Sequence, residues 1–162
     1  MKSKIIFLAT FLLVCMLLPF IAAAEEDATR EEIVEMCKKA EVLMLTNKEA
    51  GIAEIANKEG QFVWKNTYVF LMDFEGNMLA HPMIPQLTEK GPLFHVADKY
   101  PDQPKMIFVE FVDIAKKYGE GWSWYWWPKA NCREPVDKFP YIRRVGITDM
   151  LVGAGIYKSQ SG

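Results

Sequence analysis

The spacing of the apolar residues changes from a helical to an extended period part-way along the chain, and this change limits the folds open to it. Thr29 and Glu32 form a capping box, which is typical of a helix N-terminus. Behind them, apolar side chains recur at helical spacing and predict one buried face, formed by Ile33, Met36, Cys37, Ala40, Leu43 and Met44. Lys48–Lys58 is a second helical segment, and it is either separate or part of one long helix broken near Thr46-Asn47.

Downstream of this helical part, five segments have the composition of β-strands: Thr67–Phe74, Met78–His81, Gly121–Trp127, Lys138–Val145 and Met150–Tyr157. Turn residues join the first two and the last two, so antiparallel hairpins are expected. The proline-rich stretch Pro82–Pro104 is expected to cross one end of the sheet, and Pro104 to begin a helix that stops at Gly119. The predicted fold class is α+β, with a long N-terminal helix packed on a five-stranded antiparallel sheet.

The first residues have the pattern of an export signal. A short basic start precedes an uncharged run of 17 residues, Ile5–Ile21, and three alanines follow it. Small residues before the cleavage point favour removal after Ala24 over an uncleaved membrane anchor, for which the run is short. We therefore expect residues 1–24 to be a signal peptide, and residues 25–162 to form one periplasmic or secreted domain.

Charge and motif content exclude several classes of function. The 19 basic residues less Lys2 and Lys4 leave 17 against 21 acidic ones, a net charge of −4 that does not favour nucleic acid as a partner. No P-loop, Rossmann glycine pattern, nucleophile elbow or His-Glu-x-x-His sequence is present. The two histidines, His81 and His95, do not make a metal site. We therefore expect no catalytic residues, no metal and no cofactor.

Two cysteines, Cys37 and Cys132, lie beyond the predicted cleavage point. In an oxidising compartment they are able to form a disulfide, whereas Cys37 on the apolar helical face also fits a buried free thiol. The sequence leaves both alternatives open.

The densest aromatic run is GWSWYWWPK, Gly121–Lys129. Because side chains alternate along a strand, Ser123, Tyr125 and Trp127 are expected on one face, and Trp122, Trp124 and Trp126 on the other. Tyr125 and Trp127 are candidates for the wall of a small-ligand cavity, with the phenol as a hydrogen-bond donor. The other three residues form either ordinary packing or an apolar patch for a protein partner.

Lys138 and Tyr141 open the next strand and form a second candidate group. Their charge and hydroxyl are suited to holding a carboxylate. The simpler interpretation is that Lys138 is solvated and that Tyr141 is an ordinary half-buried tyrosine. For His81, likewise, the simpler interpretation is a structural role.

Four stretches in register resemble single Cache domains: Tyr68-x-Phe70-x-x-Asp73-x-x-Gly76-x-x-Leu79-Ala80-His81-Pro82, Gly121-Trp122-x-x-Tyr125-x-Trp127-Pro128-Lys129, Pro135-x-x-Lys138-x-x-Tyr141 and Gly153-x-Gly155-Ile156-Tyr157. The resemblance implies an extracytoplasmic domain with a PAS-like five-stranded sheet that binds a small organic acid such as acetate, propionate or pyruvate. It implies a ligand site built from Tyr125, Lys138 and Tyr141, and closed by Phe70, Met72 and His81.

Several positions depart from the pattern of that family. Ile84 stands where a basic residue is frequent, Thr88–Gly91 replaces a Gly-Lys turn, and Pro140 stands where serine is usual. Asp137 replaces a proline, and we expect its charge to oppose a carboxylate at Lys138.

Two functions follow from these residues. The first is an exported binding module without an output domain of its own, which either passes its signal to a membrane-bound receptor or kinase or sequesters a metabolite. The alternative is a protein-interaction or assembly subunit that keeps the fold without a working pocket, and that forms a homodimer or binds a partner through Trp124 and Trp126.

Overall fold

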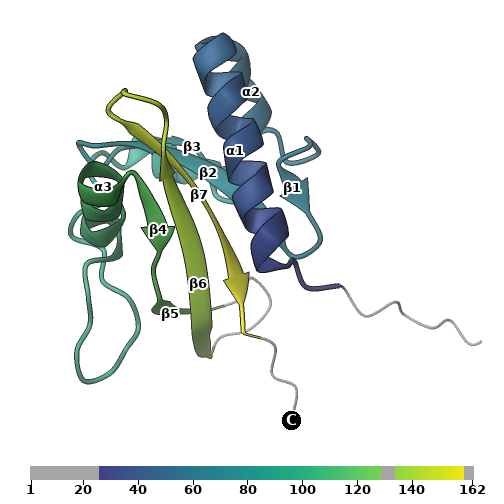
Figure 1. Cartoon of the computed structure of the whole chain (residues 1–162). Helices are drawn as coiled ribbons and strands as arrows, with labels where there is room; N and C mark the ends of the chain where they lie inside the picture. Colours follow the sequence, from purple (N-terminus) through teal and green to yellow (C-terminus); the bar gives the residue numbers. More distant parts are fainter. Residues whose placement is uncertain (1–25, 129–133, 159–162) are drawn as a thin grey trace, which may run out of the picture.

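The computed structural model describes residues 26–128 and 134–158, which form one antiparallel sheet with helices on both faces (Figure 1). The helices are α1 (Arg30–Thr46), α2 (Lys48–Ala56) and α3 (Ile107–Tyr118), and a short 3-10 helix, η1 (Pro85–Glu89), lies in the long connection. The strands are β1 (Val63–Trp64), β2 (Thr67–Asp73), β3 (Met78–Ala80), β4 (Glu120–Trp122), β5 (Tyr125–Pro128), β6 (Pro135–Arg144) and β7 (Met150–Tyr157). None of the helices in these two ranges is long and apolar enough to cross a membrane.

Seven strand segments fill five positions across the sheet, in the order β1–β2–β7–β6–β4. β3 pairs with β2 beyond β1, on the same edge. β5 continues β4 along β6 in one register, since Trp122 lies opposite Tyr141 and Tyr125 lies opposite Lys138. The predicted α+β fold, with a long N-terminal helix on an antiparallel sheet, is therefore confirmed.

The two faces of the sheet bury separate apolar clusters. Val69 and Leu71 of β2 pack with α1, whereas Phe70 and Met72 of the same strand pack with α3. Figure 1 shows α1 and α3 on opposite sides of the sheet. The predicted apolar face of α1 is confirmed, because its buried residues are Ile33, Cys37, Ala40 and Met44. Asn47 ends α1 and caps α2, which confirms the break in the helix.

The start of α3 differs from the prediction. The helix begins at Ile107 and not at Pro104, because the preceding residues are held in an extended pairing. The Asp98 N–H donates to the Lys105 carbonyl at 3.0 Å, and the Lys105 N–H donates to Asp98 Oδ1 at 3.0 Å. The same carboxylate accepts the Trp126 N–H at 3.2 Å, so the long connection is fastened to β5.

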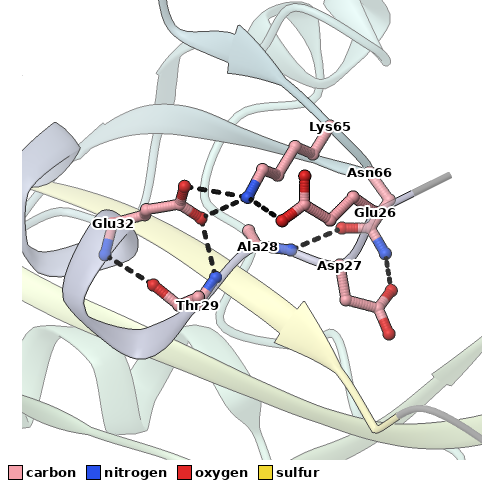
Figure 2. A network of polar contacts seen from close by, with 7 residues as sticks. All are labelled: Glu26, Asp27, Ala28, Thr29, Glu32, Lys65 and Asn66. Carbon is pink, nitrogen blue, oxygen red and sulfur yellow. Dashed lines mark hydrogen bonds and ion pairs between the residues drawn. The ribbon is translucent and has the colours of Figure 1, made fainter.

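The start of α1 is fastened to the turn between β1 and β2 by a polar network (Figure 2). Thr29 and Glu32 form the predicted capping box, with hydrogen bonds of 2.8 and 3.2 Å. Lys65, whose φ is 47°, places its Nζ 2.8 Å from Glu32 and 3.2 Å from Glu26. Asn66 contacts the Asp27 carboxylate and accepts the Ala28 N–H. These contacts set the entry of the chain into α1.

Two sequence predictions fall partly or wholly outside the described residues. The proposed signal peptide, 1–24, lies there entirely. Cys132 lies there too, while Cys37 is a free thiol on the buried face of α1.

We predict that Gly153→Ala destabilises the domain. A Cβ at this position would lie 2.5 Å from Phe70 Cζ and 2.9 Å from Ile142 Cδ1, and both side chains are buried. Overpacking of this kind costs about 1–3 kcal/mol. Urea denaturation measures the loss, and an unchanged midpoint would show that the sheet accommodates the methyl group.

Candidate ligand-binding site

The candidate site centres on Lys138, a buried lysine on the α3 side of β6. Its residue is only 6% exposed. Its Nζ lies 5.2 Å from the ring centroid of Tyr68 and 4.7 Å from that of Tyr157, so two aromatic faces hold the cation. Within the described ranges, no carboxylate forms an ion pair with it.

The strand register explains how a lysine is accommodated at this place. Lys138 lies between Tyr125 on β5 and Tyr157 on β7, and side chains paired in this way project from the same face. Gly155 provides the space, because a Cβ there would lie 3.1 Å from Lys138 Cε. The glycine of the final motif therefore allows the lysine side chain to lie across β7 toward Tyr68.

His81 lies next to this group, at the end of the first hairpin. Its ring is buried, with its centroid 4.8 Å from that of Tyr68 and 6.5 Å from that of Phe70. Its Nδ1 accepts the Ile84 N–H at 2.9 Å, so the neutral ring carries its proton on Nε2. Burial and the nearby charge of Lys138 lower the pKa of His81 to about 4. At neutral pH the imidazole is therefore an uncharged donor.

Aromatic side chains complete the surroundings. Tyr125 is buried, and its ring centroid lies 5.8 Å from that of Phe111 on α3 and 6.1 Å from that of Trp127. Burial raises the pKa of Tyr125 well above its ordinary value and the pKa of Tyr68 to about 12, so both phenols keep their protons. Met72 belongs to the same apolar cluster. With Tyr157 included, the charged and polar groups gathered here are an ammonium, three phenols and a neutral imidazole.

Tyr141 is not brought together with these residues. It is three positions from Lys138, and an odd separation places two side chains of a strand on opposite faces. Tyr141 packs in the α1 cluster, where its ring centroid lies 5.3 Å from that of Trp122. Its hydroxyl accepts a long hydrogen bond of 3.5 Å from Arg143. The geometry therefore separates this predicted site residue from Lys138.

Asp137 also faces away from Lys138, contrary to the expectation that its charge would oppose a ligand there. Its Oδ1 accepts the indole N–H groups of Trp124 and Trp126, at 2.8 and 2.7 Å. Both indoles contact the Tyr100 ring, with centroids 5.4 and 5.1 Å apart. The predicted outward pair of tryptophans is therefore engaged within the chain itself.

The alternation of faces was predicted for the aromatic run, and the structure places Tyr125 and Trp127 in the α3 cluster and Trp122 in the α1 cluster. Three further residues of the site were not predicted: Tyr68, Phe111 and Tyr157. Tyr68 shares the face of Phe70 by alternation along β2, which is a signal available in the sequence. Tyr157 and Phe111 depend on strand register and on the packing of α3, which the sequence alone does not specify.

We predict that His81 makes the stability of the domain depend on pH. The unfolded chain binds a proton at an ordinary pKa near 6.5, whereas the folded ring does so only near pH 4. The stabilisation is therefore full above pH 6.5 and is lost as pH falls toward 4, by up to about 3 kcal/mol.

Urea denaturation between pH 7 and pH 4 tests this, with His81→Asn as the comparison because its amide oxygen can still accept the Ile84 N–H. The stability advantage of the wild type over the variant should shrink with falling pH. A constant difference across this range would contradict the assignment.

Comparison with known proteins assigns this chain to a family. A family model described as a Cache domain matches residues 30–161. The chain is 32% identical over 90 residues to the methyl-accepting chemotaxis protein McpP of Pseudomonas putida. The aligned segment covers 56% of this chain and 16% of that protein. The chain thus spans about a sixth of the length of that relative.

Solved structures agree with this assignment. A Cache chemosensory domain studied for carboxylic acid recognition superposes with a TM-score of 0.60 at 25% identity, covering 77% of this chain and 85% of that one. The periplasmic sensor domain of a chemotaxis protein gives 0.61 at 24% identity, covering 80% and 90%, and shares the fold. A methyl-accepting chemotaxis protein of Vibrio parahaemolyticus gives 0.62 at 20% identity, covering 78% and 86%, and also shares the fold. The chain belongs to the Cache domain family, and its relatives named above include a chemosensory domain and the periplasmic sensor domain of a chemotaxis protein.

Proposed function

We propose that this Cache domain is an exported binding module for one small monocarboxylate of the acetate, propionate and pyruvate class, with Lys138 as the anion contact. The observation that carries the proposal is the buried ammonium of Lys138, which lies between Tyr68 and Tyr157 without a carboxylate partner among the described residues.

The energetic argument concerns the charge of this lysine. A buried charge without a counter-ion is strongly unfavourable, and cation–π contacts offset only part of that cost. A bound carboxylate would supply the missing charge. The phenol of Tyr125 and the Nε2–H of His81 are donors suited to the oxygens of such an anion, whereas a cationic ligand would find no acceptor of opposite charge among them.

The walls of the site favour a short ligand. Phe70, Phe111 and Trp127 are packed closely around Tyr125 and His81, with ring centroids 5.8 to 6.5 Å apart. Such walls suit a small apolar body attached to one charged end. The similar Cache chemosensory domain studied for carboxylic acid recognition supports the same ligand class.

Location and partner follow from the same proposal. The N-terminal sequence pattern supports export, and one structural neighbour is a periplasmic sensor domain. A membrane-bound receptor or kinase is the proposed recipient of the signal. The alternative of an assembly subunit relied on Ile84, Asp137 and the outward tryptophans, and the hydrogen bonds of Asp137 to both indoles engage these tryptophans within the chain.

Lys138→Met tests the proposed contact. We expect acetate, propionate or pyruvate to raise the melting temperature of the wild type, because a ligand at 100 times its dissociation constant stabilises a protein by about 2.7 kcal/mol. The variant should lose this shift. Its unliganded stability should be equal to or higher than that of the wild type, since an apolar side chain replaces an unpaired buried charge.

The matched control is Lys158→Met. The side chain of Lys158 is 70% exposed, and its Nζ lies 3.8 Å from Asp137 Oδ2, on the face of the sheet opposite to Lys138. It should bind the acid like the wild type. Tyr125→Phe should weaken binding by about three- to tenfold, the effect of one hydrogen bond. Acid binding that survives in Lys138→Met, or no shift in the wild type with any of the three acids, would overturn the proposal.

A further inference from the structure

A further polar group lies buried on the same face of the sheet as Lys138, outside the group of residues described above. Ser123 is 6% exposed, and its Oγ has no hydrogen-bond partner among the described residues. A buried hydroxyl without a partner is unfavourable, so an unpaired serine on this face of the sheet calls for an explanation.

The register fixes the direction of this side chain. The Ser123 N–H donates to the Pro140 carbonyl at 2.9 Å, which keeps the register of the flanking pairs Trp122–Tyr141 and Tyr125–Lys138. Alternation then places Ser123 on the face of Tyr125. Gly121 supports this placement, because a Cβ there would lie 3.0 Å from Ile114 of α3.

Neighbouring strands place small side chains next to Ser123 on this face of the sheet. Ser123 is followed on β6 by Pro140 and on β7 by Gly155, and Pro140 pairs with both. A Cβ at Gly155 would lie 3.1 Å from Lys138 Cε, so the lysine side chain extends to the β7 side of β6. Ser123 lies on the opposite side of that strand. With strands about 4.8 Å apart, the hydroxyl and the ammonium are separated by about 10 Å.

We propose that Ser123 is a specificity-determining residue that binds an uncharged oxygen of the ligand while Lys138 holds its carboxylate. This inference rests on the proposed function and narrows its ligand class. Two hydrogen bonds of about 2.8 Å leave about 4 Å between the two polar groups of the ligand. That separation matches a three- or four-carbon acid with a hydroxyl or oxo group at the end away from the carboxylate.

Isothermal titration calorimetry with propionate and 3-hydroxypropionate tests the inference on matched ligands. Wild-type protein should bind 3-hydroxypropionate about three- to tenfold more tightly than propionate, the effect of one net hydrogen bond. Ser123→Ala should remove this preference and leave propionate affinity unchanged. Ser123→Cys, whose side chain is slightly larger but donates weakly, should give the same loss.

Thr148→Ala serves as the control. It removes a hydroxyl that donates to the Val145 carbonyl in the β6–β7 turn, and it should keep the preference. If propionate binds through Lys138 while the preference is absent, or survives in Ser123→Ala, the inference is overturned and the proposed function stands. If neither acid binds to the wild type, the proposed function fails and this inference fails with it.

Discussion

The burial of a lysine ammonium among aromatic rings is the interaction on which the character of this domain depends. Lys138 occupies a position that a β-sheet normally fills with an apolar residue, and it has space there because Gly155 has no side chain. Its Nζ lies near Tyr68 on one strand and Tyr157 on another, so the lysine brings β2, β6 and β7 together around one positive charge. A bound anion would lower the free energy of a core built around an unpaired cation, and the proposed ligand response of the site rests on this effect.

Strand β6 separates two environments through its alternation. On one side, Lys138 and Ile142 face α3 and the aromatic cluster. On the other side, Tyr141 packs with α1, and Arg143 contacts Glu41 of α1 and Glu120 of β4. Glu41 also accepts the Gly146 N–H at 3.0 Å, so the far end of β6 is bonded directly to the helix. One strand therefore touches both the candidate site and the long N-terminal helix.

Much of the fold was predictable because local signals agreed with one another. The capping box at Thr29, the helical face through Cys37 and the hairpin through Gly76 each have a short-range cause, and each was confirmed. The predicted start of α3 was wrong, because Asp98 bonds to Lys105, seven residues away, and holds the segment before the helix in an extended pairing. The helix propensities of the residues in that segment do not reveal this pairing.

The candidate site was predictable only in part, for the same reason. Phe70, His81, Tyr125 and Lys138 were identified from the sequence and do lie together. Tyr141 was grouped with Lys138, although strand alternation alone separates residues three apart. Tyr157 requires the β6–β7 register and Phe111 requires the docking of α3, and both are tertiary properties.

A crystal structure of the domain grown with propionate tests the central claim most directly. The account predicts the carboxylate within hydrogen-bond distance of Lys138 Nζ, on the α3 face of the sheet and among Tyr68, His81 and Tyr125. A ligand bound on the α1 face beside Tyr141, or a Lys138 ammonium left without an anion while propionate occupies another site, would contradict it.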